Sequence, residues 1–173
     1  MPDVILVDEN DVPVGTMEKL EVHEKGLLHR AFSIFIFNKN GDMLLQQRAD
    51  RKYHSPGLWT NACCSHPAPG EETLPAATRR LQEEMGFATF LKPAFKFTYQ
   101  CHFDNDLSEH EYDHVFTGLY EGDIVAAEEE VKTWKYVSID EIAQGLEIFP
   151  ENYTAWFRIA FPKLVEYLAG SQG

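Results

Sequence analysis

The stretch that decides the fold is WTNACCSHPAPGEETLPAATRRLQEEMGF, residues 59–87. Near its end, a helix-forming run places Arg79, Arg80, Glu83 and Glu84 just before Gly86. Residues three or four apart share one face of a helix, so Arg80 and Glu84 are predicted to project together. Such a pair is often an ordinary surface ion pair. It also suits a metal diphosphate complex, because Mg²⁺ binds carboxylates together with phosphate oxygens while arginine binds the remaining oxygens. The helix alone leaves both interpretations open.

The predicted helix has recognisable ends. Thr73 is the expected N-cap, Pro75 is tolerated in the first turn, and Gly86 is expected to end the helix in a left-handed conformation. Glu71 then lies in the preceding loop.

Composition predicts one compact domain over residues 1–173, because 44% of the residues are hydrophobic and 13% are aromatic. The formal net charge of -13 argues against nonspecific binding to nucleic acid or an anionic membrane. No apolar run approaches the roughly 20 residues needed to span a bilayer. The start, MPDVILVDEN, does not resemble a signal peptide, so we expect a cytoplasmic protein. The odd set Cys63, Cys64 and Cys101 suits a reducing compartment.

Apolar runs and turn residues predict the remaining elements. We expect a hairpin over 4–7 and 12–17, strands over 32–37, 43–48 and 95–103, and an extended segment from Glu109. After residue 128 we expect a strand and then a helix that is capped by Ser138 or Asp140. The last helix is expected over about 151–168, with a kink at Pro162. This alternation predicts a mixed sheet between helices.

Several polar residues admit two interpretations. Arg48, Arg51 and Lys52 form either a solvated loop or a phosphate site. Glu109 and Glu111 are two apart and point the same way if the segment is extended, either towards solvent or into a metal site. His23 and His29, like Lys19, have no evident role on their own.

The stretch 59–87 matches the Nudix box, whose pattern is Gly, five residues, Glu, seven residues, Arg-Glu, an aliphatic residue, one residue, Glu-Glu, one residue, Gly. The matching residues are Glu71, Arg79, Leu81, Glu83, Glu84, Gly86 and Phe87. Ser65 replaces the first glycine, and Arg80 replaces the glutamate that in Nudix hydrolases helps to hold metal or position water. With the pattern WTNxxCxHP, which selects Cys64, the chain resembles the type I isopentenyl diphosphate isomerases, which carry a degenerate box.

This resemblance implies a Nudix α/β/α sandwich with two metal sites. The family's first site matches His23, His29, His66, Glu109 and Glu111, a nitrogen and oxygen set that suits Mn²⁺, Mg²⁺ or Zn²⁺. A second ion, Mg²⁺, would be held by the diphosphate, by Glu84 and by the backbone carbonyl of Cys64. The residues that match the family's diphosphate ligands are Lys19, Arg48, Lys52 and Arg80.

The implied reaction moves a double bond in a five-carbon diphosphate by adding one proton and removing another. Glu111, assisted by Tyr99, matches the residue that delivers the first proton, and Cys64 matches the one that removes the second. Trp156 matches the tryptophan whose ring stabilises the carbocation. On sequence alone, Tyr99 and Trp156 are equally well explained as core residues.

Two other functions compete with an isomerase. The box alone would allow a Nudix hydrolase of a nucleoside diphosphate derivative, which Arg80 and Cys64 oppose. A noncatalytic binding domain would predict decayed metal residues, whereas all five are present. We expect a small-molecule diphosphate substrate, a monomer or homodimer, and an N-terminal segment, residues 1–30, whose ordering is coupled to metal binding.

Overall fold

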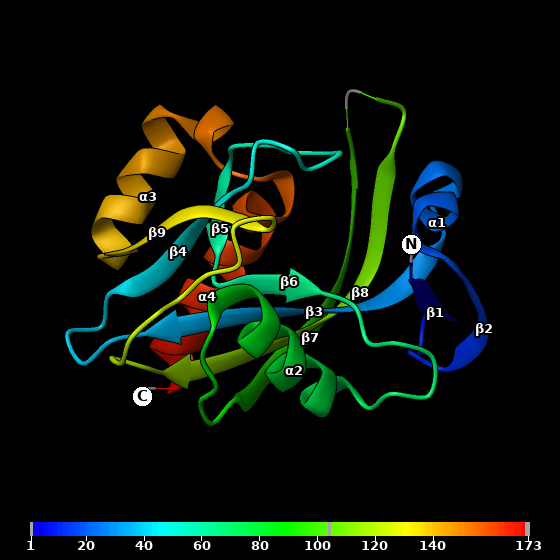
Figure 1. The fold of residues 1–173 in the computed structure, drawn as a ribbon, viewed down its shortest axis with the longest axis horizontal. Coiled ribbons are helices and arrows are strands. Elements are labelled where there is room, and N and C mark those ends of the chain that lie inside the picture. The colour runs from blue at the N-terminus through cyan, green and yellow to red at the C-terminus, as the bar shows by residue number, and fades with distance from the viewer. Residues whose placement is uncertain (1, 104, 172–173) are drawn as a thin grey trace.

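The computed structural model describes residues 2–103 and 105–171 of the chain. The elements in order are β1 Asp3–Val7, β2 Pro13–Glu18, α1 Lys19–Lys25, β3 Leu28–Phe37, β4 Met43–Arg48, β5 Trp59–Asn61, β6 Cys63–Ser65, α2 Thr73–Met85, β7 Lys92–His102, β8 Ser108–Leu119, β9 Val131–Val137, α3 Ile139–Ile148, the 3-10 helix η1 Pro150–Asn152, and α4 Ala155–Ser171. The two ends of the chain lie at opposite sides of the molecule (Figure 1).

Strand β3 is the centre of a mixed sheet. It pairs in parallel with β8 along its whole length and antiparallel with β1, β4 and β6. Strand β7 continues the sheet beyond β8, and β9 pairs with β4. The parallel neighbour explains why the run 32–37 is apolar at nearly every position, because such a strand is buried on both faces.

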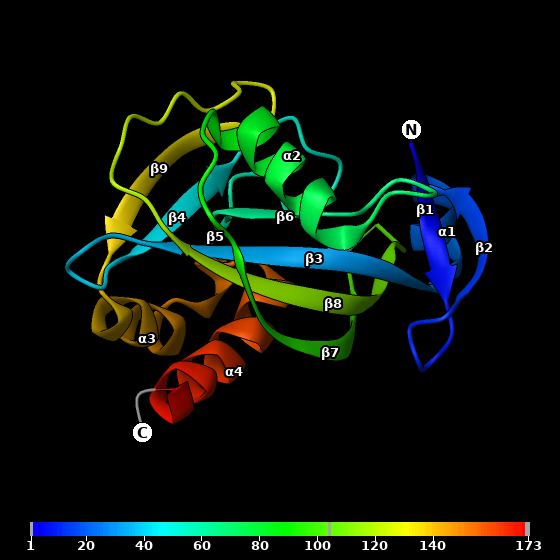
Figure 2. The same cartoon turned by 90° about the horizontal axis from the view of Figure 1, so that it is seen from below.

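The side chains of β3 alternate between two apolar layers. Phe32, Ile34 and Ile36 pack with α2, whereas Phe35 and Phe37 pack with α3 and α4. Figure 2 shows α2 on one face of the sheet and both α3 and α4 on the other. The predicted α/β/α sandwich with a mixed central sheet is therefore confirmed.

Helix α2 differs from the prediction at its start. Its N-cap is Glu72, not Thr73, because the Glu72 carbonyl already accepts the first helical hydrogen bond, from the Ala76 amide at 3.1 Å. Threonine suits a cap by composition, but here the chain turns into the helix one residue earlier. The end is as predicted, since Gly86 adopts a left-handed φ of 76° and its amide donates to the Gln82 carbonyl.

The last helix also begins later than predicted. Residues Pro150–Asn152 form the separate turn η1, and α4 starts at Ala155, where the Thr154 hydroxyl accepts a hydrogen bond from the Phe157 amide at 3.2 Å. Pro162 lies inside this helix, and the kink there stays a prediction.

The N-terminal hairpin is confirmed as β1 and β2, and Ser138 caps α3 as one of the two predicted candidates. Helix α1 and the three-residue strands β5 and β6 are too short for a periodic pattern to reveal. Among residues 2–103 and 105–171, no helix combines the length and apolar character that crossing a membrane requires.

Candidate active site

The register of three strands places Glu111 at the centre of the site. His29 on β3 is its direct partner on one side, and Tyr99 on β7 is its partner on the other. Paired residues on neighbouring strands project to the same face of a sheet, so these three side chains meet. The Tyr99 hydroxyl contacts both Glu111 and Glu109, the latter at 3.0 Å. The two glutamates point the same way, as their spacing predicted.

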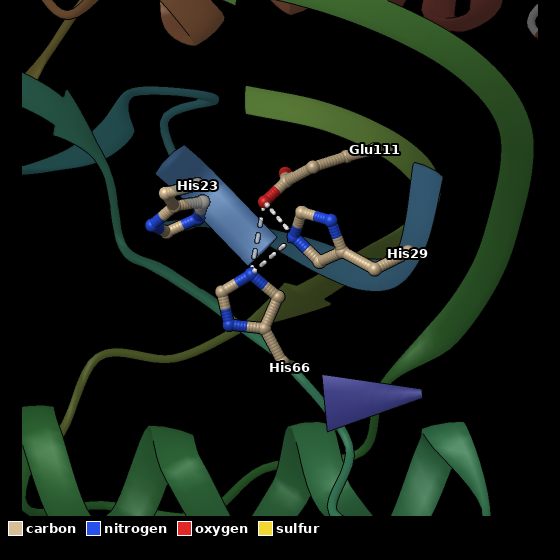
Figure 3. A group of neighbouring side chains, drawn as sticks. All are labelled: His23, His29, His66 and Glu111. Atoms are coloured by element: carbon tan, nitrogen blue, oxygen red, sulfur yellow. Dashed lines mark hydrogen bonds and ion pairs between the residues drawn. The ribbon is translucent and has the colours of Figure 1, made fainter. Parts of the chain in front are cut away.

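Four side chains converge within 4.8 Å of one another through their ligand atoms: His23 from α1, His29, His66 from the segment after β6, and Glu111 (Figure 3). The Nε2 atoms of His29 and His66 are 3.2 Å apart, and each faces the same carboxylate oxygen of Glu111, at 3.3 and 2.9 Å. These four residues could hold a metal ion.

The hydrogen bonds around the imidazoles fit this use. His29 Nδ1 donates to the Leu27 carbonyl at 2.9 Å, which leaves the lone pair on Nε2 directed at the centre of the group. His23 Nδ1 lies 2.9 Å from the Tyr53 hydroxyl, while its Nε2 is buried without a hydrogen-bond partner among the described residues. Buried lone pairs pointing at one another are unfavourable unless a cation lies between them.

The protonation states also suit a metal. Burial, helped by the neighbouring His66, lowers the pKa of His23 to about 3. Burial lowers the pKa of His66 to about 4, although Glu111 opposes the shift. Both rings are therefore neutral near pH 7, which is the form that binds metals.

Glu109 lies beside the group of four. Its Oε1 is 3.9 Å from His23 Nε2. Burial and the charge of Glu111 raise the pKa of Glu109 well above its usual range. Burial acts to raise the pKa of Glu111 too, but the facing His29 and His66 prevail and lower it well below that range. These opposite shifts mean that a proton shared by the pair would reside on Glu109.

One cleft brings together most of the remaining predicted residues. Its lining includes Lys19, Arg48, Lys52, Cys64, His66, Arg80, Glu84, Tyr99, Glu109, Glu111 and Trp156. It thus gathers four cations, Lys19, Arg48, Lys52 and Arg80, in an otherwise acidic chain, an arrangement that suits an anion. The buried His23 and His29 lie next to His66 and Glu111 of this lining.

The cations of the cleft are partly paired with acids. Arg80 Nη2 is 3.3 Å from Glu84 Oε2, as the helical spacing predicted. Lys52 Nζ is 2.6 Å from Glu130 Oε2, and Arg80 Nη2 is 3.8 Å from the other oxygen of Glu130. Sequence reasoning missed Glu130, because a third acid in the run Glu128–Glu130 is indistinguishable from a solvated face.

The two adjacent cysteines occupy different environments. Cys64 is partly exposed, and its thiol donates to Asn61 Oδ1 at 3.2 Å and lies 3.5 Å from the Ser33 hydroxyl. Burial raises the pKa of this thiol, and the charge of Asp113 adds to the effect. Cys63 is fully buried on the side of α2.

Trp156, near the start of α4, lines the cleft. The Arg48 guanidinium lies 5.0 Å from the centre of its ring, and His54 meets the ring edge-on at 5.7 Å. Sequence reasoning missed Tyr53, His54, Ser33 and Asp113, and it used Asn61 only as part of the pattern that selects Cys64. Tyr53 and His54 sit in the predicted basic loop, so their position was the only available signal.

Comparison with known proteins agrees with this geometry. Residues 27–157 match the NUDIX domain family. The chain is 53% identical over 167 residues to an isopentenyl-diphosphate Delta-isomerase of Pectobacterium atrosepticum, a match covering 96% of this chain and 93% of that relative. An isopentenyl-diphosphate Delta-isomerase 2 of Aromatoleum aromaticum is 47% identical, covering 94% and 86%. The solved structure of DR0079 from Deinococcus radiodurans aligns with a TM-score of 0.78 over 93% of this chain and 98% of its own, and at 14% identity it shows the fold alone.

Proposed function

The chain belongs to the isopentenyl-diphosphate Delta-isomerases, within the NUDIX fold, and on this premise we propose which of its side chains move the protons. The protein is an enzyme that converts isopentenyl diphosphate into dimethylallyl diphosphate by relocating a double bond. The convergence of Glu111, Tyr99 and Cys64 in one cleft beside the cations carries the proposal. The competing function, hydrolysis of a nucleoside diphosphate derivative, is disfavoured by Arg80 in place of a box glutamate.

Glu111 delivers the first proton to the terminal alkene carbon. The single hydroxyl proton of Tyr99 cannot serve Glu109 and Glu111 together. Because the pKa of Glu109 is raised, protonated Glu109 donates to Tyr99, and Tyr99 donates to Glu111. This series of hydrogen bonds supplies a proton to Glu111 without bulk water. Bulk water in the site would trap the carbocation.

Cys64 removes the second proton from the carbon next to the oxygen-bearing one. Its sulfur lines the same cleft as Glu111. The thiol must first give up its own proton, and because its pKa is raised, the resulting thiolate is a strong base for the proton of the substrate. Trp156 faces the cation formed between the two steps. Its ring already lies beside the Arg48 guanidinium, which supports its affinity for positive charge.

The basic side chains Lys19, Arg48, Lys52 and Arg80 bind the diphosphate. The residues that would hold Mn²⁺, Mg²⁺ or Zn²⁺ are His23, His29, His66 and Glu111, with Glu109 alongside. Those that would hold the Mg²⁺ of the substrate are Glu84 and the Cys64 carbonyl. When bound, the first ion fixes Glu111 and the second neutralises the diphosphate.

All side chains of this site come from one chain, so a monomer is sufficient and a homodimer is compatible, with residues 1–173 forming a single domain. A cytoplasmic location accords with the need to keep Cys64 reduced.

The test combines two readouts in one tube. Purified protein is incubated with isopentenyl diphosphate and Mg²⁺, and both acid-labile allylic diphosphate and released phosphate are measured. Allylic product without phosphate is expected. Cys64→Ala and Glu111→Gln should each abolish turnover while leaving circular dichroism unchanged. Near wild-type turnover in either variant would remove that residue from the mechanism, and phosphate release would favour the hydrolase.

A further inference from the structure

The adjacent cysteines of β6 project to opposite sides of their strand, as successive strand residues do. Cys64 faces Asn61 and Ser33 in the cleft. Cys63 is fully buried in the apolar layer beneath α2. A buried thiol in such a layer is usually a small hydrophobic residue. Here it has a polar partner.

The partner is the carboxylate of Glu84. The Cys63 thiol donates to Glu84 Oε2 at 3.0 Å, and the Arg80 guanidinium lies 3.3 Å from the same oxygen. Glu84 is 6% exposed and lines the cleft. In the part of the chain that the structure describes, its other oxygen, Oε1, accepts no hydrogen bond. The carboxylate is thus fixed through one oxygen and leaves the second available.

We propose that Cys63 is a positioning residue that orients Glu84 for Mg²⁺. This inference rests on the proposed role of Glu84 as a ligand of the substrate's Mg²⁺. A hydrogen bond to one oxygen of a ligating carboxylate fixes its rotamer and presents the other to the metal. Since the carbonyl of the next residue, Cys64, is the second protein ligand in that proposal, β6 sets the position of both.

The environment of Cys63 suits a permanent donor. The Cys63 side chain is fully buried, and its thiol donates to Glu84 Oε2 at 3.0 Å. Its role differs from that of Cys64, which exchanges a proton with substrate.

Three variants separate the hydrogen bond from packing. Cys63→Ala removes the donor, and Cys63→Ser restores a hydroxyl donor at the same place. Ile36→Val is the control, because Ile36 is fully buried in the same apolar layer and has no polar atom. Calorimetry measures the binding of 3-methylbutyl diphosphate, a saturated analogue that cannot be protonated, to each metal-loaded protein. The measurement is repeated at a series of Mg²⁺ concentrations.

The half-saturating Mg²⁺ concentration should rise about tenfold in Cys63→Ala, the usual effect of removing a group that supports a metal ligand. Cys63→Ser should lie close to the wild type, and Ile36→Val should not change. Equal shifts in Cys63→Ala and Ile36→Val would reduce Cys63 to a packing residue and overturn the inference.

Glu84→Gln, measured in parallel, tells the two proposals apart. If Glu84→Gln leaves the Mg²⁺ titration unchanged, Glu84 is not a ligand and both proposals fail. If Glu84→Gln shifts it but Cys63→Ala does not, only the role of Cys63 is refuted. When both shift it, adding Cys63→Ala to Glu84→Gln should have no further effect, since the two residues act through one contact.

Discussion

Replacing His54 by phenylalanine should make the stability of the protein less sensitive to acid. The His54 ring stacks on Phe103 with centroids 4.6 Å apart, and its Nδ1 is buried without a hydrogen-bond partner among the described residues. Burial, together with the charge of Arg48, lowers the pKa of His54 from 6.5 to about 2. The folded protein therefore keeps this ring neutral.

The sign follows from the two states. The unfolded chain protonates His54 near pH 6.5, while the folded protein does so only near pH 2. Stability contributed by the neutral ring is complete above pH 6.5 and is lost as the pH falls below it. At pH 5.0, about 1.5 pH units lower, this single group costs about 2 kcal/mol of the free energy of unfolding, at roughly 1.4 kcal/mol per unit. His54→Phe keeps an aromatic ring but cannot bind the proton.

Urea denaturation at pH 7.5 and pH 5.0, with chelator present so that metal loss does not contribute, measures the effect. As the pH falls from 7.5 to 5.0, the difference in free energy of unfolding, His54→Phe minus wild type, should increase by about 2 kcal/mol. Phe103→Leu, which weakens the same stack without removing a titrating group, should shift both measurements alike. A wild-type to His54→Phe difference that is the same at both pH values would refute the reasoning.

Two further predictions concern the metal and the end of α2. Metal at about 100 times its Kd should stabilise the fold by about 2.7 kcal/mol, and removing the metal with a chelator should speed amide exchange in residues 1–30. His23→Gln should lose both effects. Identical amide exchange with and without metal would count against metal-coupled ordering. Gly86→Ala should lower the melting temperature more than Gly70→Ala, although both have positive φ, because a Cβ at Gly86 meets the Val125 carbonyl whereas one at Gly70 meets open space. The strain alone costs about 1–2 kcal/mol, so equal losses would show that the clash is relieved.

The sequence predicts elements whose physics is local. Helix α2 has a helical pattern and a glycine stop, and β3 has an apolar run long enough to identify a buried strand. The Arg80 and Glu84 contact follows from helical spacing alone. The observed N-cap of α2 is Glu72 and not the predicted Thr73, because the preceding turn, and not the residue type, decides where the helix begins.

The site is less accessible to such reasoning. The four side chains that meet in the site come from a helix, two strands and a loop, and they lie far apart in the sequence. Spacing therefore does not predict that His23, His29, His66 and Glu111 come together. Resemblance to a family suggested this set, and the folded chain brings four of its five members within ligand distance. Glu130 and His54 belong to no recognisable pattern, because their contacts arise from long-range packing.

The parallel pairing of β3 with β8 has a consequence for synthesis on the ribosome. His29 and Glu111 are register partners, yet Glu111 is added roughly 4–16 s after His29 at typical elongation rates. Until β8 has been synthesised, the apolar strand β3 lacks its parallel partner and stays exposed. Nascent sheets are most prone to aggregate in this interval. A slip of one residue in this pairing would place Tyr112 beside His29 and leave the imidazoles without their carboxylate. A chain paired out of register would therefore lack the complete set of four side chains that could hold a metal ion.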